Sequence, residues 1–131
     1  MSKTILVVED NEMNLRLMTD LLGYYGYRVL EAGNGAQALI MADQHHIDLI
    51  VMDMQMPIMS GYEAVKKLRS DKKNSEIKII AVTSFALTDE RERILDTGVD
   101  EFISKPIDTR EFPKIIAMLI ARESTRTGRL G

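Results

Sequence analysis

Residues 49–52 read Leu-Ile-Val-Met, an unbroken apolar run, and the next residue is Asp53. A short run of this kind is typical of a parallel strand that is covered on both faces of its sheet. Four further segments have a strand-like composition: Ile5–Val8, Arg28–Glu31, Ile79–Val82 and Glu101–Ile103. Together with Leu49–Met52 they give five β-α units, which predict a doubly wound α/β fold with right-handed crossovers.

The segments between these strands carry apolar residues at the three- and four-residue spacing of amphipathic helices. These residues are Leu15, Met18, Leu21 and Leu22, then Ala36, Leu39 and Ile40, then Val65 and Leu68, and finally Phe112, Ile115, Ile116, Leu119 and Ile120. Thr88 is predicted to cap the fourth helix and Gly98 to end it. Pro113 has no N–H to donate, so we expect a late or irregular start of the last helix.

The composition is that of one folded domain, with 45% apolar and 28% charged residues among 131. The sequence has no cysteine, which excludes disulfides and thiolate metal sites. A net charge of −3 with mixed signs gives no electrostatic footprint for nucleic acid. The run Thr4–Val8 is too short for a signal peptide, and no segment approaches the roughly 18 apolar residues of a membrane span. We therefore expect a cytoplasmic domain over residues 1–122, a flexible tail over residues 123–131, and no direct contact with nucleic acid or membrane.

Polar side chains stand directly after four of the predicted strands. They are Glu9 and Asp10, then Asp53, then Thr83, and finally Lys105. Because the carboxyl ends of parallel strands share one edge, where ligands bind in such sheets, we expect these side chains to converge. Acids after strands also serve as helix N-caps, and that alternative suits Asp10 taken alone. It does not explain an acid directly after residues 49–52, or a lysine joined to Pro106.

Three carboxylates and one ammonium leave two negative charges in excess at this edge. Like charges this close disfavour each other's ionised form, and a divalent cation offsets the excess. All-oxygen ligands favour Mg²⁺, which keeps several waters and is often shared with a phosphate. A carboxylate beside Mg²⁺ and a lysine can attack phosphorus and form an aspartyl phosphate. The residues therefore predict phosphoryl transfer to Asp53.

These motifs resemble the receiver domain of two-component response regulators over roughly residues 3–122. The resemblance is carried by the acidic pair in the segment Val7-Val8-Glu9-Asp10-Asn11, by Asp53 followed by Met56-Pro57 and Gly61, by Thr83, and by Lys105-Pro106. It implies a flavodoxin-like five-stranded sheet with strand order 2-1-3-4-5. Within the family, residues 9–14 and 103–107 resemble the DivK-type single-domain regulators of bacterial cell division.

The resemblance also implies a role for each site residue. Asp53 would be the phosphoacceptor, and Asp10, Asp53 and the main-chain carbonyl of Gln55 would bind Mg²⁺ directly, with Glu9 acting through water. Lys105 would contact the phosphoryl group, and the peptide bond before Pro106 would be cis. Thr83 would turn its hydroxyl toward the phosphoryl group, and Phe102 would swing inward behind it. Phe102 replaces the tyrosine that is frequent in the family, so it cannot make a phenol's hydrogen bond.

The family implies a phosphoacceptor switch that assists its own phosphorylation and dephosphorylation, rather than an enzyme acting on external substrates. A histidine kinase or histidine phosphotransfer protein would donate the phosphoryl group. A downstream protein would recognise the face made by helix 4, strand 5 and helix 5, with Phe102, Ile94, Leu95 and Pro113. The alternative is a receiver module cut from a larger DNA-binding regulator or hybrid histidine kinase.

Three other functions are weaker interpretations of the same sequence. Residues 33–38 match the loose dinucleotide-binding pattern, but the second nucleotide-binding half is missing and the glycines are explained by a turn. A haloacid dehalogenase-type phosphatase would need an aspartate at position 55, where this chain has Gln55. His45 and His46 are adjacent, so they do not share a helix face and are expected to lie on the surface.

Phe85 generates a prediction about the lifetime of the phosphoryl group. It stands two residues after Thr83, at a position that is often acidic or amide in family members that lose the group quickly. We expect Phe85 to hinder the attacking water, so Phe85→Glu should accelerate dephosphorylation after the donor is removed, as followed by intact-mass spectrometry. Decay no faster than in the wild type would contradict this role.

Overall fold

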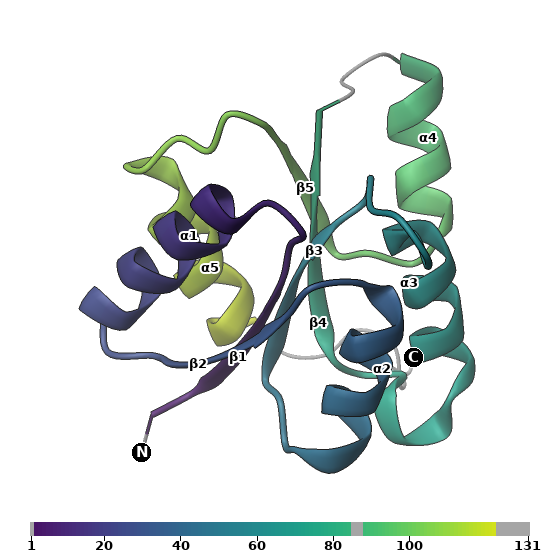
Figure 1. The fold of residues 1–131 in the computed structure, drawn as a ribbon, viewed down its shortest axis with the longest axis horizontal. Helices are drawn as coiled ribbons and strands as arrows, with labels where there is room; N and C mark the ends of the chain where they lie inside the picture. Colours follow the sequence, from purple (N-terminus) through teal and green to yellow (C-terminus); the bar gives the residue numbers. More distant parts are fainter. Residues whose placement is uncertain (1, 85–87, 123–131) are drawn as a thin grey trace.

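The computed structural model describes residues 2–84 and 88–122, and Figure 1 shows their arrangement. All strands are parallel and form one sheet in the order β2-β1-β3-β4-β5. The strands are β1 (Thr4–Val8), β2 (Arg28–Ala32), β3 (Leu49–Asp53), β4 (Lys78–Thr83) and β5 (Glu101–Ser104). The helices are α1 (Glu12–Tyr24), α2 (Gly35–Gln44), α3 (Gly61–Ser70), α4 (Thr88–Asp96) and α5 (Glu111–Ala121). The predicted fold class and strand order are confirmed.

Helices cover both faces of the sheet, which explains the unbroken apolar strands. In Figure 1, α1 and α5 lie on one face, and α2, α3 and α4 lie on the other. Alternate residues of β1 serve the two cores: Leu6 and Val8 belong to the core under α2 and α3, whereas Ile5 and Val7 belong to the core under α1 and α5. The central strands are thus held from both sides, and their carboxyl ends are rigid platforms for the loops.

The helix boundaries follow from local side-chain chemistry. Asn11, Asn34 and Ser60 each accept a hydrogen bond from a main-chain N–H in the first turn of α1, α2 and α3. Gly98 follows α4 at a φ of 103°, in the left-handed region that favours glycine, so the predicted stop is confirmed. Thr88 is the first helical residue of α4, and the cap position before it lies outside the described residues.

The start of α5 is late, as Pro113 predicts. Asp108 stabilises the turn before the helix: its Oδ1 accepts from the N–H groups of Arg110 (2.8 Å) and Glu111 (3.1 Å). Its main-chain oxygen accepts from Phe112 N at 2.9 Å. Pro113 is the third residue of α5, which begins at Glu111.

A short 3-10 helix, η1 (Lys72–Asn74), was not predicted from the sequence. The segment is stabilised by Arg69, whose guanidinium donates to the main-chain oxygens of Gly98 (2.9 Å), Ser75 (3.2 Å) and Ile77 (2.6 Å). The same guanidinium lies 3.1 Å from Asp100 Oδ2, and both side chains are largely buried. Arg69 thereby joins α3 to the residues just before β4 and β5. These contacts help to position β5, the strand that precedes Lys105.

Within the described ranges, no helix is both long and apolar enough to span a bilayer.

Arg69 generates a stability prediction. Arg69→Met removes the cation from a buried pair and leaves the Asp100 carboxylate without its guanidinium, which costs roughly 3–5 kcal/mol of unfolding free energy. Urea unfolding followed by circular dichroism measures the loss.

Lys67→Met is the matched control, because Lys67 lies on the same helix but is exposed. It should change stability by no more than about 0.5 kcal/mol. Equal stabilities for the two variants would show that the Arg69 interactions are not structural.

Candidate functional site

Three carboxylates meet at the carboxyl edge of the sheet. Glu9 and Asp10 follow β1, and Asp53 is the last residue of the neighbouring strand β3. One carboxylate oxygen from each lies within 4.8 Å of the others. Glu9 and Asp53 are each only 1% exposed, whereas Asp10 is exposed. The predicted convergence of the acids is therefore present, with two of them inside the protein.

Lys105 reaches this cluster from the loop between β5 and α5. Its Nζ lies 3.3 Å from Asp53 Oδ2 and 3.4 Å from Glu9 Oε1. The main chain is fixed by a hydrogen bond from Lys105 N to Thr83 O at 2.8 Å. The Lys105–Pro106 peptide bond is cis, as the sequence resemblance implied. One ammonium thus serves two buried carboxylates.

Main-chain donors satisfy only part of the acid cluster. Asn11 N donates to Glu9 Oε2 and Gln55 N donates to Asp53 Oδ1, each at 3.1 Å. Glu9 Oε1 is buried and accepts no hydrogen bond from the described part of the chain. Burial, and next the charge of Asp53, raise the pKa of Glu9 to about 7. An oxygen-only donor set with a buried, hydrogen-bond-poor carboxylate oxygen fits a hard divalent cation such as Mg²⁺.

The loop between β3 and α3 folds back tightly on Asp53. A Cβ at Gly61 would lie 2.5 Å from Asp53 O, so only glycine fits at the predicted motif position. Ile58 in the same loop has a φ of 71° and is 84% exposed. A β-branched residue is strained in this left-handed region, and no burial of its side chain offsets the strain. Nothing in the sequence pattern indicated this feature.

Thr83 is the last residue of β4 and its side chain is fully buried. The Gln55 side chain contacts it: Gln55 Nε2 donates to Thr83 Oγ1 at 2.9 Å. The family resemblance had implied a site role only for the main-chain carbonyl of Gln55. The side-chain contact joins residues 28 positions apart in sequence, so no local spacing could have revealed it.

The face made by α4, β5 and α5 differs from the prediction in two residues. Phe102 is partly buried, and the guanidinium of Arg91 lies 5.4 Å from its ring centroid. Leu95 is exposed, as expected, but Ile94 is buried under α4. Pro113 is also buried, because it packs toward the side of α5 that faces the end of α1, so its predicted place on the surface was wrong. Phe85 lies outside the described residues.

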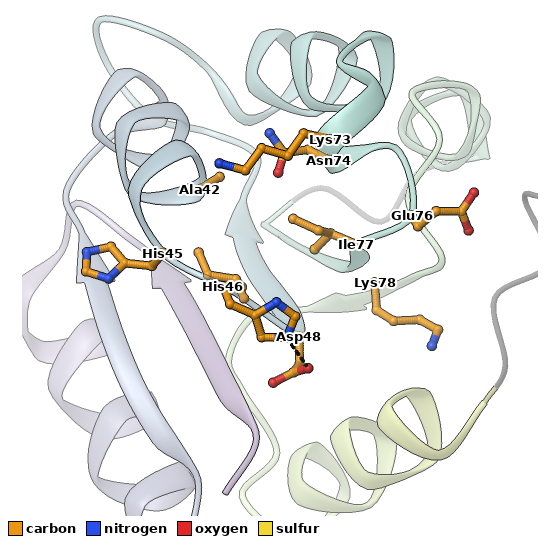
Figure 2. A pocket seen from close by; sticks show the side chains of 10 residues that line it. Ala42, His45, His46, Asp48, Lys73, Asn74, Glu76, Ile77 and Lys78 are labelled. Carbon is orange, nitrogen blue, oxygen red and sulfur yellow. Dashed lines mark hydrogen bonds and ion pairs between the residues drawn. The ribbon is translucent and has the colours of Figure 1, made fainter.

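A recess at the opposite, amino-terminal edge of the sheet is shown in Figure 2. His46 is exposed, as predicted, and its ring nitrogen lies 3.2 Å from Asp48 Oδ1. Lys73 and Lys78 also line the recess, but each donates to a carbonyl near the end of a helix, Asp43 O in α2 and Arg122 O after α5. A lysine ammonium at the carboxyl end of a helix interacts favourably with the helix dipole. The recess is therefore explained by structural contacts, and it lies at the opposite edge from Asp53.

Comparisons of the sequence with known proteins find relatives along most of the chain. The model of the response regulator receiver domain family matches residues 5–117. The polar-differentiation response regulator DivK of Brucella ovis is 43% identical over 116 residues, which cover 88% of this chain and 94% of that protein.

Solved structures show the same fold. The receiver domain of the sensor histidine kinase PA1611 from Pseudomonas aeruginosa, determined with a magnesium ion in its active-site cleft, is 33% identical. It superposes with a TM-score of 0.87 over 93% of this chain and 100% of that one. The chemotaxis protein CheY4 of Vibrio cholerae, at 24% identity, has a TM-score of 0.86 over 91% of this chain and 99% of its own, which shows the shared fold. The chain therefore belongs to the response regulator receiver domain family and takes part in two-component phosphorelay signalling.

Proposed function

We propose that Asp53 accepts a phosphoryl group from a phosphohistidine donor, and that this event changes the face made by α4, β5 and α5. The observation that carries the proposal is a buried Asp53 carboxylate 3.3 Å from the Lys105 ammonium, with two further carboxylates beside it. An Asp53 oxygen attacks phosphorus, the P–N bond to the donor imidazole breaks, and the imidazole leaves with the electron pair. Lys105 and the Thr83 hydroxyl contact the phosphoryl oxygens and stabilise their charge.

We infer that Mg²⁺ is the cation of this site. Asp10, Asp53 and the main-chain carbonyl of Gln55 would hold it directly, and Glu9 would hold it through water. When bound, it offsets negative charge and polarises the transferring group. Support comes from the donor set of this chain and from the magnesium ion in the related receiver domain of PA1611.

Exposed apolar side chains beside the site support docking of a protein donor, a histidine kinase or histidine phosphotransfer protein. Met13 and Leu17 lie on α1, beginning three residues after Asp10, and are 82% and 40% exposed. Ile58, 84% exposed, lies in the loop that follows Asp53. Isolated exposed apolar residues are ordinary, but three of them near one charged site form a surface on which a partner helix can dock.

The packing of α4 supports its role in output to a downstream protein. Among the described side chains of residues 89–96, only Ile94 is buried. Arg91 and Arg93 add contacts with aromatic rings, Phe102 at 5.4 Å and Tyr62 at 4.1 Å. Such contacts are worth about 0.5–1 kcal/mol at exposed sites. A helix held this weakly is a suitable element to shift on phosphorylation.

The role of Asp53 as the phosphoacceptor can be tested by mass spectrometry. Acetyl phosphate with Mg²⁺ should add about 80 Da, the mass of one phosphoryl group, to the wild type. Asp53→Asn should abolish the adduct because the attacking carboxylate oxygen is lost. Intact-mass spectrometry measures both.

Asp71→Asn, which alters an exposed acid far from the site, is the matched control and should be labelled like the wild type. An adduct that forms without a divalent cation, or that persists in Asp53→Asn, would overturn the mechanism.

Another prediction concerns pH. In the metal-free protein the pKa of Glu9 rises from 4.5 to about 7 on folding, so the folded state binds more protons between these values. This contribution is complete below pH 4.5 and is lost as the pH rises through 7, by at most roughly 3 kcal/mol. Glu9→Gln should flatten that slope in urea unfolding, whereas Mg²⁺ should reverse it, because metal binding requires deprotonated carboxylates.

Glu92→Gln, at an exposed position of α4, should keep the wild-type slope. An unchanged slope in Glu9→Gln would assign the pH dependence to other groups.

A further inference from the structure

The side chain of Gln55 connects the phosphoacceptor strand to the end of β4. Gln55 lies two residues after Asp53, and its N–H donates to Asp53 Oδ1 at 3.1 Å. Its side-chain Nε2 donates to Thr83 Oγ1 at 2.9 Å, and its Oε1 accepts from Ser84 N at 3.0 Å. One residue therefore contacts the reacting carboxylate with its main chain and two consecutive residues of the neighbouring strand and loop with its side chain.

The orientation of the Gln55 amide is fixed by its neighbours. A main-chain N–H can only donate, so Ser84 N requires Oε1 on its side. This leaves the Nε2 group facing Thr83, where the hydroxyl oxygen accepts. Thr83 is fully buried and Gln55 is half-buried, so water competes poorly for these bonds. The contact is specific to the glutamine amide, because an aliphatic side chain of the same length makes neither bond.

These bonds constrain the movement that the proposed function requires. In the proposed switch, Thr83 turns its hydroxyl to a phosphoryl group on Asp53, and a rotation about its Cα–Cβ bond moves Oγ1 out of its position 2.9 Å from Gln55 Nε2. The main-chain oxygen of Thr83 also accepts from Lys105 N at 2.8 Å. A displacement of the Thr83 main chain would therefore also displace the loop after β5. Ser84 directly follows β4, so a bond to its N–H restrains the main chain where that strand ends.

We propose that the Gln55 side chain is a positioning residue that holds Thr83 and the start of the β4–α4 connection in the unphosphorylated arrangement. This inference rests on the proposed function of Asp53 and Thr83. It separates two roles within one residue: the main-chain carbonyl serves the cation, and the side-chain amide opposes the switch. Breaking the amide contacts should therefore favour the phosphorylated arrangement.

The test compares Gln55→Met with the wild type. Methionine keeps the length of the side chain and the main-chain carbonyl but removes both amide bonds. The probe is beryllofluoride, a stable mimic of a carboxylate-bound phosphoryl group, titrated with Mg²⁺ present. Because an ordinary hydrogen bond shifts an equilibrium by about two- to ten-fold, the half-saturating concentration should fall by about that factor. In NMR spectra without beryllofluoride, the Thr83 methyl signal of the variant should lie on the line from the free to the bound wild-type position.

Gln37→Met is the matched control. Gln37 Oε1 also accepts from a main-chain N–H, that of Gly33 at 2.7 Å, but the side chain belongs to α2 and is exposed. This variant should bind Mg²⁺ and beryllofluoride like the wild type. Calorimetry gives the Mg²⁺ dissociation constant of Gln55→Met, so that beryllofluoride binding is compared at equal Mg²⁺ saturation.

Three other results would contradict the role of Gln55 or the function of the site. Unchanged or weaker beryllofluoride binding by Gln55→Met would show that the amide does not oppose the switch. A tighter beryllofluoride complex that is no longer tighter at equal Mg²⁺ saturation would show that the side chain acts on the cation instead. A wild type that forms no Mg²⁺-dependent complex would overturn the proposed function itself, whatever the variants do.

Discussion

The burial of two carboxylates beside each other is the constraint on which the rest of the site depends. β1 and β3 are adjacent parallel strands, with Val8 opposite Met52, so the residues that follow them must lie side by side. Glu9 and Asp53 are both 1% exposed at this point, and a single lysine contacts them. Desolvation and repulsion raise the pKa of Glu9 to about 7. The arrangement is unfavourable on its own and becomes favourable when a cation or a proton joins it, which makes the site responsive to ligands.

The interactions that stabilise the fold lie away from this unfavourable cluster of carboxylates. The two apolar cores lie along the strands, and the buried Arg69–Asp100 pair lies near the amino-terminal edge, where its guanidinium also binds main-chain oxygens before β4. The loops that carry Lys105 and Ile58 lie at the other edge. Substitutions at the site can therefore change its charge without removing the contacts that hold the sheet. α4 differs from the other helices because Ile94 is its main buried contact, so a change near this helix can loosen it.

The sequence predicted the secondary-structure elements, which have periodic patterns, and the site residues that directly follow the strands. It did not predict contacts that depend on side-chain geometry between strands. The apolar runs located β1, β3 and β4, because both faces of these strands are covered. The edge strands β2 and β5 carry polar residues, and their strand-like composition located them. Placement of Glu9, Asp53 and Lys105 followed from the shared edge. The Gln55–Thr83 contact, the positive φ of Ile58 and the inward packing of Pro113 depend on loop conformation and rotamers, which have no periodicity in the sequence.

A rigid parallel sheet can transmit a signal only through elements that have two arrangements of similar energy. The central strands are not such elements, because every residue of β1 and β3 is buried and interdigitated. In the switch proposed above, the end of β4 is such an element: hydrogen bonds of Gln55 hold it, and each is modest in free energy. The next described element, α4, is held by one apolar side chain and two arginine–ring contacts. Because each step is weakly held, differential contacts of a few kcal/mol from a single phosphoryl group can shift the population of the whole path.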